Sequence, residues 1–177
     1  MLISNMSTTS KKAIVLIGFM GAGKSTVGRV LAKLSGLALV DLDALIVQQQ
    51  GRTIPVIFAD QGEAAFRHYE TEALRSLSDA SPIVLATGGG IVGYQENWQL
   101  MRRLGSVIYL RANWETLRSR LAGSIDRPLA TAECGEADIK NLWQQRLSLY
   151  EQADLIVDTD GRNVDEVVLE ILTRAKD

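Results

Sequence analysis

The sequence predicts a doubly wound α/β domain with a five-stranded parallel sheet. Short apolar runs alternate along the chain with longer amphipathic stretches. These runs show no alternation of polar and apolar residues, which is typical of strands buried on both faces of a parallel sheet. Each run precedes a helical pattern, and right-handed crossovers then place helices on both faces. A length of 177 residues fits one such domain.

The first predicted strand is Ala13–Ile17, and a helical pattern over Lys24–Ser35 follows it. The other strands are predicted at Leu37–Val40, Ile83–Ala86, Ser106–Leu110 and Asp154–Val157. The other helices are predicted at Ala44–Gln50, Gln61–Ser78, Tyr94–Leu104, Asn113–Leu121, Glu136–Tyr150 and Val164–Lys176. A glycine, which often terminates a helix, directly follows three of these patterns, at Gly36, Gly51 and Gly105.

Two segments stand apart from this alternation. Residues 1–12 are polar, and we expect a disordered or loosely held tail before a single domain over 13–177. Residues 122–135 have neither a helical nor a strand period. This stretch is long for a connection in a compact domain and is a candidate lid or binding loop.

The composition excludes several classes of protein. The net charge of −2 argues against a dedicated nucleic-acid binder. The single cysteine, Cys134, cannot form an internal disulfide, and the single histidine, His68, leaves no zinc cluster and no Ser-His-Asp triad. No apolar run reaches the roughly 20 residues of a membrane span, and no signal peptide is visible. The cysteine count fits a reducing compartment, and we expect either a bacterial cytoplasmic protein or, if the chain is a processed mature form, a plastid stromal one.

Residues Gly18–Ser25 read GFMGAGKS and match the phosphate-binding loop pattern G-x-x-x-x-G-K-[ST]. A buried strand precedes the motif and a helical pattern follows it, as the motif requires. Glycines let the backbone aim its N–H groups at phosphate oxygens, while Lys24 reaches the β- and γ-phosphates and Ser25 ligates Mg2+. The motif alone does not separate a kinase from an NTPase. The absence of an N-K-x-D tetrad favours ATP over GTP.

Asp41 and Asp43 follow the second predicted strand. Residues i and i+2 leave a strand on the same side, so both carboxylates can face the phosphates. One could hold Mg2+ through water, and the other could accept a hydrogen bond from an attacking hydroxyl. The alternative is that Asp43 caps the helix that follows.

Three further features have a functional and a structural interpretation. The triplet Gly88–Gly90 after the third strand can contact a ligand through its backbone, or can simply form a turn. Arg67 lies mid-helix, where spacing alone favours an exposed partner of Glu63 or Glu70. Arg127, a lone Arg-Pro in the candidate lid, is placed to reach a site on closure and exclude water. His68 and Cys134 are interpreted as having no catalytic role.

The order and spacing of six segments resemble shikimate kinases: GAGKST, VDLD, GEAAFRHYE, ATGGG, DRPL and RLSLY. The resemblance extends from about residue 13 to 170. It implies a three-layer α/β/α P-loop fold, like that of nucleoside-monophosphate kinases, with a lid. It implies transfer of the γ-phosphoryl of ATP to the 3-hydroxyl of shikimate with Mg2+, by a monomer without nucleic-acid or membrane partners.

The resemblance also assigns roles to single residues. It places ATP against Gly21, Ala22, Gly23, Lys24, Ser25, Thr26, Arg120, Arg127 and Arg162. It places shikimate against Asp43, Arg67, Glu70, Gly88, Gly89, Gly90 and Arg146. Of these residues, Arg67 and Arg146 bind the carboxylate of shikimate. Mg2+ lies near Ser25 and Asp41. The catalytic groups are Lys24, Asp43 and Arg127.

The sequence departs from the family pattern at two places, and three other functions are alternatives to that of a shikimate kinase. Leu42 stands where Ser or Thr is common between the aspartates, and the lid reads RPLAT where a second leucine often follows. A kinase for another carboxylated metabolite, such as gluconate, fits the same core. A kinase-like binding module is disfavoured because every charged site residue is present, and a nucleic-acid-stimulated NTPase is disfavoured by the acidic balance.

Overall fold

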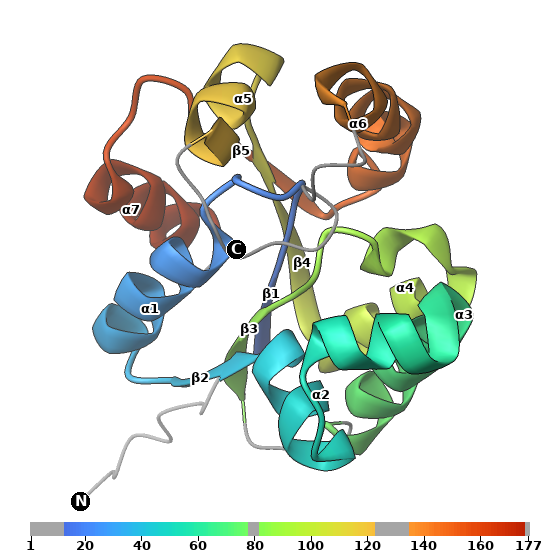
Figure 1. Cartoon of the computed structure of the whole chain (residues 1–177). Coiled ribbons are helices and arrows are strands. Elements are labelled where there is room, and N and C mark those ends of the chain that lie inside the picture. The colour runs from blue at the N-terminus through green and yellow to red at the C-terminus, as the bar shows by residue number, and fades with distance from the viewer. Residues whose placement is uncertain (1–12, 78–81, 123–134, 176–177) are drawn as a thin grey trace, which may run out of the picture.

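The computed structural model describes residues 13–77, 82–122 and 135–175. Five strands form one sheet: β1 Ala13–Ile17, β2 Ala38–Asp41, β3 Ile83–Ala86, β4 Gly105–Arg111 and β5 Leu155–Asp158. Their order is β2-β3-β1-β4-β5, and every neighbouring pair is parallel (Figure 1). The predicted fold class, a doubly wound five-stranded parallel sheet, is confirmed.

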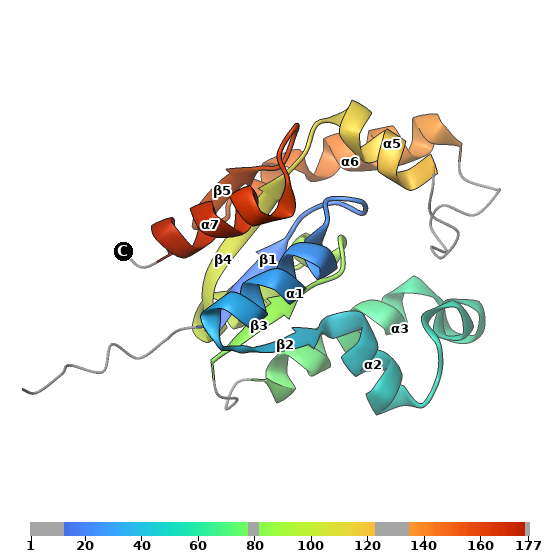
Figure 2. The ribbon, with the colours of Figure 1, turned by 90° about the vertical axis from the view of Figure 1, so that its left-hand side faces the viewer.

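Helices cover both faces of this sheet. They are α1 Lys24–Ser35, α2 Leu42–Gln50, α3 Ile54–Ser76, α4 Gln95–Leu104, α5 Trp114–Ala122, α6 Glu136–Tyr150 and α7 Val164–Arg174, with a 3-10 turn η1 at Ile91–Gly93. Figure 1 shows α1 and α7 on one side of the sheet and α3 and α4 on the other. Figure 2 shows α5 with α6 lying well apart from α2 with α3. No helix in these described ranges is both long and apolar enough to cross a membrane.

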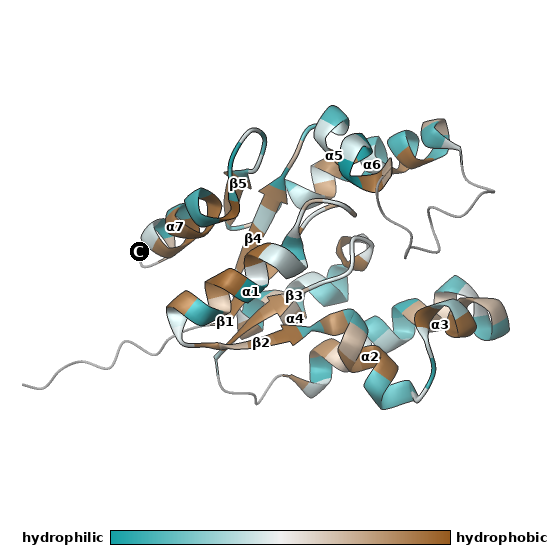
Figure 3. Ribbon diagram, turned by 60° about the vertical axis from the view of Figure 1, so that its left-hand side comes forward, coloured by the Kyte–Doolittle hydropathy of each residue, from teal (hydrophilic) through white to brown (hydrophobic). Residues whose placement is uncertain are grey.

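The central strand provides the middle of the core. All five residues of β1 are buried, and Val15, Leu16 and Ile17 have no exposed surface. The strands are accordingly mostly hydrophobic in Figure 3, whereas the helices carry both polar and apolar residues. Burial of β-branched and leucine side chains on both faces explains why these runs lack a polar alternation.

Most element boundaries agree with the sequence prediction, but α2 and α3 begin earlier. The helix predicted at 44–50 starts at Leu42, because the carboxylate of Asp41 accepts hydrogen bonds from the N–H groups of Asp43 and Ala44. Asp41, and not Asp43, is therefore the N-cap. Within α3, Gly62 has a non-helical backbone (φ 79°, ψ 178°) and divides the element into two helical segments. The second segment corresponds to the helix predicted from residue 61. The first segment, from Ile54, was not predicted, and it has a proline in its first turn, a position that tolerates the missing N–H. The turn η1 was not predicted.

The end of β3 is tied to the end of β1 beside it. Both the N–H and the hydroxyl of Thr87 donate to the carbonyl oxygen of Leu16, at 3.2 and 2.9 Å. Thr87 precedes the glycine triplet, and Leu16 lies two residues before the phosphate loop. These two segments therefore lie at the same edge of the sheet, where the carboxyl ends of parallel strands form a ligand crevice.

The packing of β4 on β1 gives a first testable prediction. Gly105 pairs with Ala13, and a methyl group at this position would overlap the backbone of Ala13. Backbone of a central strand cannot move aside without loss of its ladder, so we expect Gly105→Ala to lower the free energy of unfolding by about 3 kcal/mol. Urea unfolding followed by circular dichroism measures this change.

The matched control is Gly93→Ala. Apart from its two chain neighbours, no atom of the described residues lies within 4 Å of a methyl group placed there, so its effect should stay within about 1 kcal/mol. Equal unfolding midpoints for Gly105→Ala and the wild-type chain would contradict the packing argument.

Candidate active site

The phosphate loop joins β1 to α1 and forms one wall of the site. Gly21 and Gly23 have φ angles of 80° and 89°, a left-handed conformation that favours glycine. The buried side chain of Lys24 donates hydrogen bonds to the carbonyls of Gly18 and Phe19, at 2.8 and 2.9 Å. Its ammonium group thus lies over the loop at the N-terminus of α1. Loop N–H groups, helix end and ammonium together form an anion-binding site.

A cavity of about 420 Å³ opens in front of this loop. Every predicted ATP-binding residue in the described ranges lines it: Gly21, Ala22, Gly23, Lys24, Ser25, Thr26, Arg120 and Arg162. Asp41 and Asp43 line it as well. Sequence reasoning missed several other lining residues, namely Val27, Thr87, Thr159, Asn163, Val164 and Val167. The last four surround the start of α7, and the only local signal there is a helix-capping pattern.

Ser25 and Asp41 bring two oxygen ligands together inside this cavity. The hydroxyl of Ser25 donates to Oδ2 of Asp41 at 3.1 Å, while Oδ1 of Asp41 caps α2. Within the described ranges, no cluster of three or more His, Cys, Asp or Glu side chains could enclose a metal. Mg2+ usually takes one or two protein oxygens and completes its shell with phosphate and water. Ser25 and Asp41 fit that requirement.

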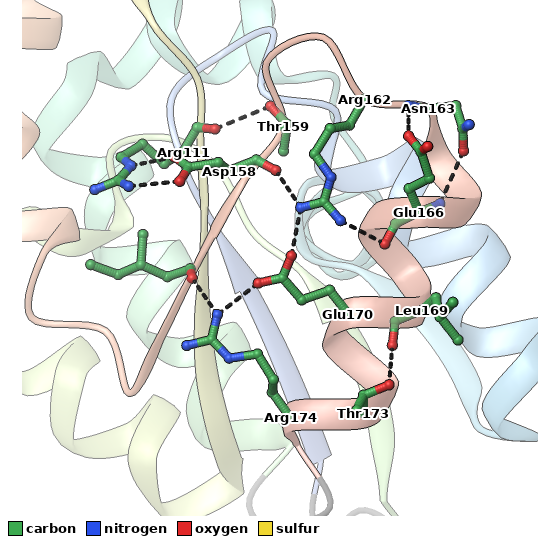
Figure 4. Close-up of polar contacts among 11 residues, drawn as sticks. Arg111, Asp158, Thr159, Arg162, Asn163, Glu166, Leu169, Glu170, Thr173 and Arg174 are labelled. Carbon is green, nitrogen blue, oxygen red and sulfur yellow. Dashed lines mark hydrogen bonds and ion pairs between the residues drawn. The ribbon is translucent and has the colours of Figure 1, made fainter.

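Arg162 and Arg120 form the outer wall of the cavity by different means. Arg162 donates to the carbonyls of Asp158 and Glu166, at 3.0 and 2.9 Å, and to the carboxylate of Glu170 at 2.5 Å (Figure 4). The hydrogen bond from Arg162 holds the pKa of Glu170 below its usual range. Arg162 is thus fastened to α7 and supports the loop before it. Arg120 is exposed and donates to the carbonyl of Gly21 at 3.1 Å.

A second cavity of about 340 Å³ adjoins the first. The predicted acceptor residues all line it: Asp43, Arg67, Glu70, Gly88, Gly89, Gly90 and Arg146. An apolar set missed by sequence reasoning completes it: Met20, Val47, Ile54, Pro55, Phe58 and Phe66. The rings of Phe58 and Phe66 are 4.8 Å apart. This cavity therefore combines two guanidinium groups with an apolar wall, which suits a small carboxylated ring.

Arg67 is buried, contrary to the exposed position that its spacing alone favoured. Its guanidinium donates to Glu70 at 2.6 Å and to Glu63 at 2.8 and 3.1 Å. Both predicted partners are therefore present, and they orient the guanidinium toward the cavity. Three of its five N–H groups are used in these contacts. A guanidinium held in this way keeps donors for a carboxylate.

Glu70 is completely buried beneath Arg67. Burial raises the pKa of its carboxyl group above the ordinary value, although the charge and hydrogen bond of Arg67 oppose that shift. A buried carboxylate without its arginine would be strongly unfavourable. The pair therefore fixes the position of both side chains.

The glycine triplet makes room for these charged groups. A methyl group at Gly90 would overlap the guanidinium of Arg67. At Gly88 it would lie 2.9 Å from Oε1 of Glu70 and 3.3 Å from Oδ1 of Asp43. Close packing is therefore one reason why Gly88 and Gly90 carry no side chain.

Asp43, Gly88 and Gly89 line both cavities. They form the junction between the cavity in front of the phosphate loop and the cavity lined by Arg67 and Arg146. The carboxylate of Asp43 is half-buried in the first turn of α2. A hydroxyl at this junction would therefore face both a carboxylate and a terminal phosphate.

Some predictions fall outside this description. Arg127, predicted to be catalytic, Cys134 and most of the predicted lid lie outside the described residues, and so does the predicted tail over 1–12. His68 is exposed on α3, as expected. Trp98 and Trp114 are buried packing residues.

Comparison with known proteins gives a consistent result. The family model for shikimate kinase matches residues 20–176. A curated shikimate kinase from Geobacter sulfurreducens is 47% identical over 160 residues, which cover 90% of this chain and 88% of that protein. A solved shikimate kinase from Acinetobacter baumannii, in complex with shikimate, superposes with a TM-score of 0.86 at 36% identity, covering 92% of each chain.

A gluconokinase from Sinorhizobium meliloti is also similar, with a TM-score of 0.64 at 17% identity, covering 94% of this chain and 95% of that one. A likeness at this low identity shows a shared fold only. The family match and the identity to curated relatives extend over most of the chain. The chain therefore belongs to the shikimate kinase family.

Proposed function

We propose that this chain transfers the γ-phosphoryl group of ATP to the 3-hydroxyl of shikimate, giving shikimate 3-phosphate and ADP. The observation that carries the proposal is the junction of the two cavities at Asp43, Gly88 and Gly89. One cavity contains a phosphate loop, and the other contains a pair of arginines with an apolar wall. This arrangement suits transfer from a nucleotide to a small carboxylated alcohol.

The nucleotide side supplies positive charge. The loop N–H groups and Lys24 would hold the β- and γ-phosphates, with the base extending toward Arg120 and Arg162. Ser25 and Asp41 would hold Mg2+, which neutralises charge on the phosphates when it is bound. We assign the remaining positive charge to Arg127. Phosphoryl transfer needs little beyond such positioning and charge stabilisation.

The acceptor side supplies orientation. Arg67 and Arg146 would bind the carboxylate as guanidinium forks, which fixes the ring at its far end. Phe58 and Phe66 would cover the apolar part of the ring. The 3-hydroxyl would then lie against Asp43 at the junction. Binding at both ends converts the reaction into one between two oriented groups.

The transfer step follows from this geometry. The hydroxyl oxygen attacks the γ-phosphorus in line with the bond to the β-phosphate oxygen, which breaks with its electron pair and leaves as ADP. Asp43 orients the hydroxyl and accepts its proton as the new P–O bond forms. Lys24 stabilises the charge on the transferred group.

One chain lines both cavities within the described residues. We therefore propose that a monomer, with a single domain over 13–177, is the active unit. Curated relatives such as the Geobacter sulfurreducens protein are bacterial. This favours the bacterial cytoplasm over the plastid stroma as the place of action.

A coupled assay of ADP release tests the function directly. We expect release with ATP, Mg2+ and shikimate together, and none when shikimate or Mg2+ is omitted. Gluconate replaces shikimate in a parallel reaction, since its carboxylate could engage the same arginines. ADP release with gluconate and none with shikimate would reject the proposed acceptor.

Asp43→Asn tests the proton acceptor. The amide keeps the shape of the carboxylate but cannot accept the proton, so we expect kcat to fall at least about 100-fold. Affinity for ADP, measured by calorimetry, should change by less than about twofold, because the phosphate loop is intact.

The control for this variant is Asp60→Asn, which neutralises an exposed carboxylate of α3 that lines neither cavity. Its kcat should equal that of the wild-type chain. Normal turnover by Asp43→Asn would show that Asp43 does not act on the hydroxyl.

Arg146→Lys tests recognition of the carboxylate. Lysine keeps the charge but loses the bidentate fork, so kcat/KM for shikimate should fall about 10- to 100-fold. KM for ATP should remain within about twofold of the wild-type value. Arg103→Lys, at an exposed position of α4, is the control. A rise in KM for ATP alone would place Arg146 on the nucleotide instead.

A further inference from the structure

Tyr150, the last residue of α6, contacts the backbone of the glycine triplet at the junction. Its side chain is completely buried. Its hydroxyl donates a hydrogen bond of 2.6 Å to the carbonyl oxygen of Gly89, a residue 61 positions away that lines both cavities. A phenol is thus attached directly to the backbone of the glycine triplet.

The ring of Tyr150 is held in one orientation. It stacks on Tyr109 of β4, with ring centroids 5.0 Å apart and an interplanar angle of 18°. Burial raises the pKa of the Tyr150 hydroxyl above its ordinary value, while the charge of Arg146 opposes the shift. The hydroxyl therefore stays protonated and remains a donor throughout the usual pH range.

The hydrogen bond from Tyr150 constrains the peptide group that joins Gly89 to Gly90. In a trans peptide the C=O and N–H point in opposite directions. Holding the carbonyl of Gly89 toward Tyr150 therefore fixes the direction of the N–H of Gly90, a residue that lines the acceptor cavity. Without this bond, three adjacent glycines would have wide conformational freedom.

The same helix carries Arg146, one turn before Tyr150. Residues i and i+4 share a face of a helix, and Arg146 lines the acceptor cavity. α6 also packs against η1, which directly follows the triplet. A single helix thus delivers a guanidinium to the cavity and a hydroxyl to its backbone wall.

We propose that Tyr150 is a positioning residue for the acceptor. Its hydroxyl holds the Gly89–Gly90 peptide in register with Arg146, so that backbone and guanidinium meet the substrate carboxylate and ring together. This inference rests on the proposed function, because it concerns the same acceptor site. It assigns no contact with the nucleotide and no chemical step to Tyr150.

The test compares Tyr150→Phe with Tyr109→Phe. Both variants keep the aromatic stack, and each removes one hydroxyl. Of these two hydroxyls, only that of Tyr150 makes a hydrogen bond within the described residues. We expect Tyr150→Phe to raise the Kd and KM for shikimate about tenfold, by release of the glycine backbone. Affinity for ADP should stay within about twofold, and Tyr109→Phe should leave both ligands unaffected.

A double-mutant cycle with Arg146→Lys tests the link between hydroxyl and guanidinium. If both act on one bound group, the combined variant should lose less shikimate affinity than the product of the two single losses. The inference would be overturned if Tyr150→Phe and Tyr109→Phe bound shikimate with equal affinity. It would also be overturned if Tyr150→Phe lost affinity for shikimate and for ADP to the same extent, which would indicate a general structural defect.

The wild-type chain separates this inference from the proposed function. Shikimate binding and shikimate-dependent ADP release by the wild-type chain, with an unaffected Tyr150→Phe variant, would reject only the role of Tyr150. Absence of both from the wild-type chain would reject the proposed acceptor itself.

Discussion

The pairing of β1 with both β3 and β4 is the constraint on which the site depends. It places the segments after these strands side by side at one edge of the sheet, although three helices and strand β2 separate β1 from β3 in the chain. The double hydrogen bond from Thr87 to Leu16 fastens that edge. The phosphate loop and the glycine triplet therefore share a junction, and chemistry between two ligands becomes possible there.

Around that junction, buried polar groups restrict the charged side chains to single positions. Thr71 donates to Asn97 at 2.8 Å, and Asn97 donates to the carbonyl of Ile91 at 3.0 Å, which ties α3 to the segment after the triplet. α3 also carries Arg67 and Glu70, whose ion pair is buried. A buried pair of this kind contributes little net stability because of desolvation. Its value here is that the guanidinium is oriented before a ligand arrives, which lowers the entropic cost of binding.

Particular residues show where sequence reasoning succeeded and where it failed. The phosphate loop and the order of strands follow from local patterns, and both are present as expected. The alternative that Asp43 caps α2 is wrong, because the strand continues directly into the helix and its last residue, Asp41, is the N-cap. Arg67 was expected to be exposed on spacing alone, yet Gly90 leaves the space that buries it. Phe58 and Tyr150 were given no role, because an apolar or aromatic side chain looks the same in a sequence whether it lines a cavity or fills a core.

The fold class, the phosphate-binding loop and the resemblance to one enzyme family could all be inferred from the sequence alone. These depend on hydrophobic period, helix signals and short motifs, all of which are local. The folded chain was needed to show that Asp43, Gly88 and Gly89 line both cavities, and that Tyr150 donates a hydrogen bond to Gly89, 61 residues away. Contacts of this kind depend on the order of the strands in the sheet and on the space left between packed elements. Both result from contacts between segments far apart in the chain, so no local sequence pattern predicts them.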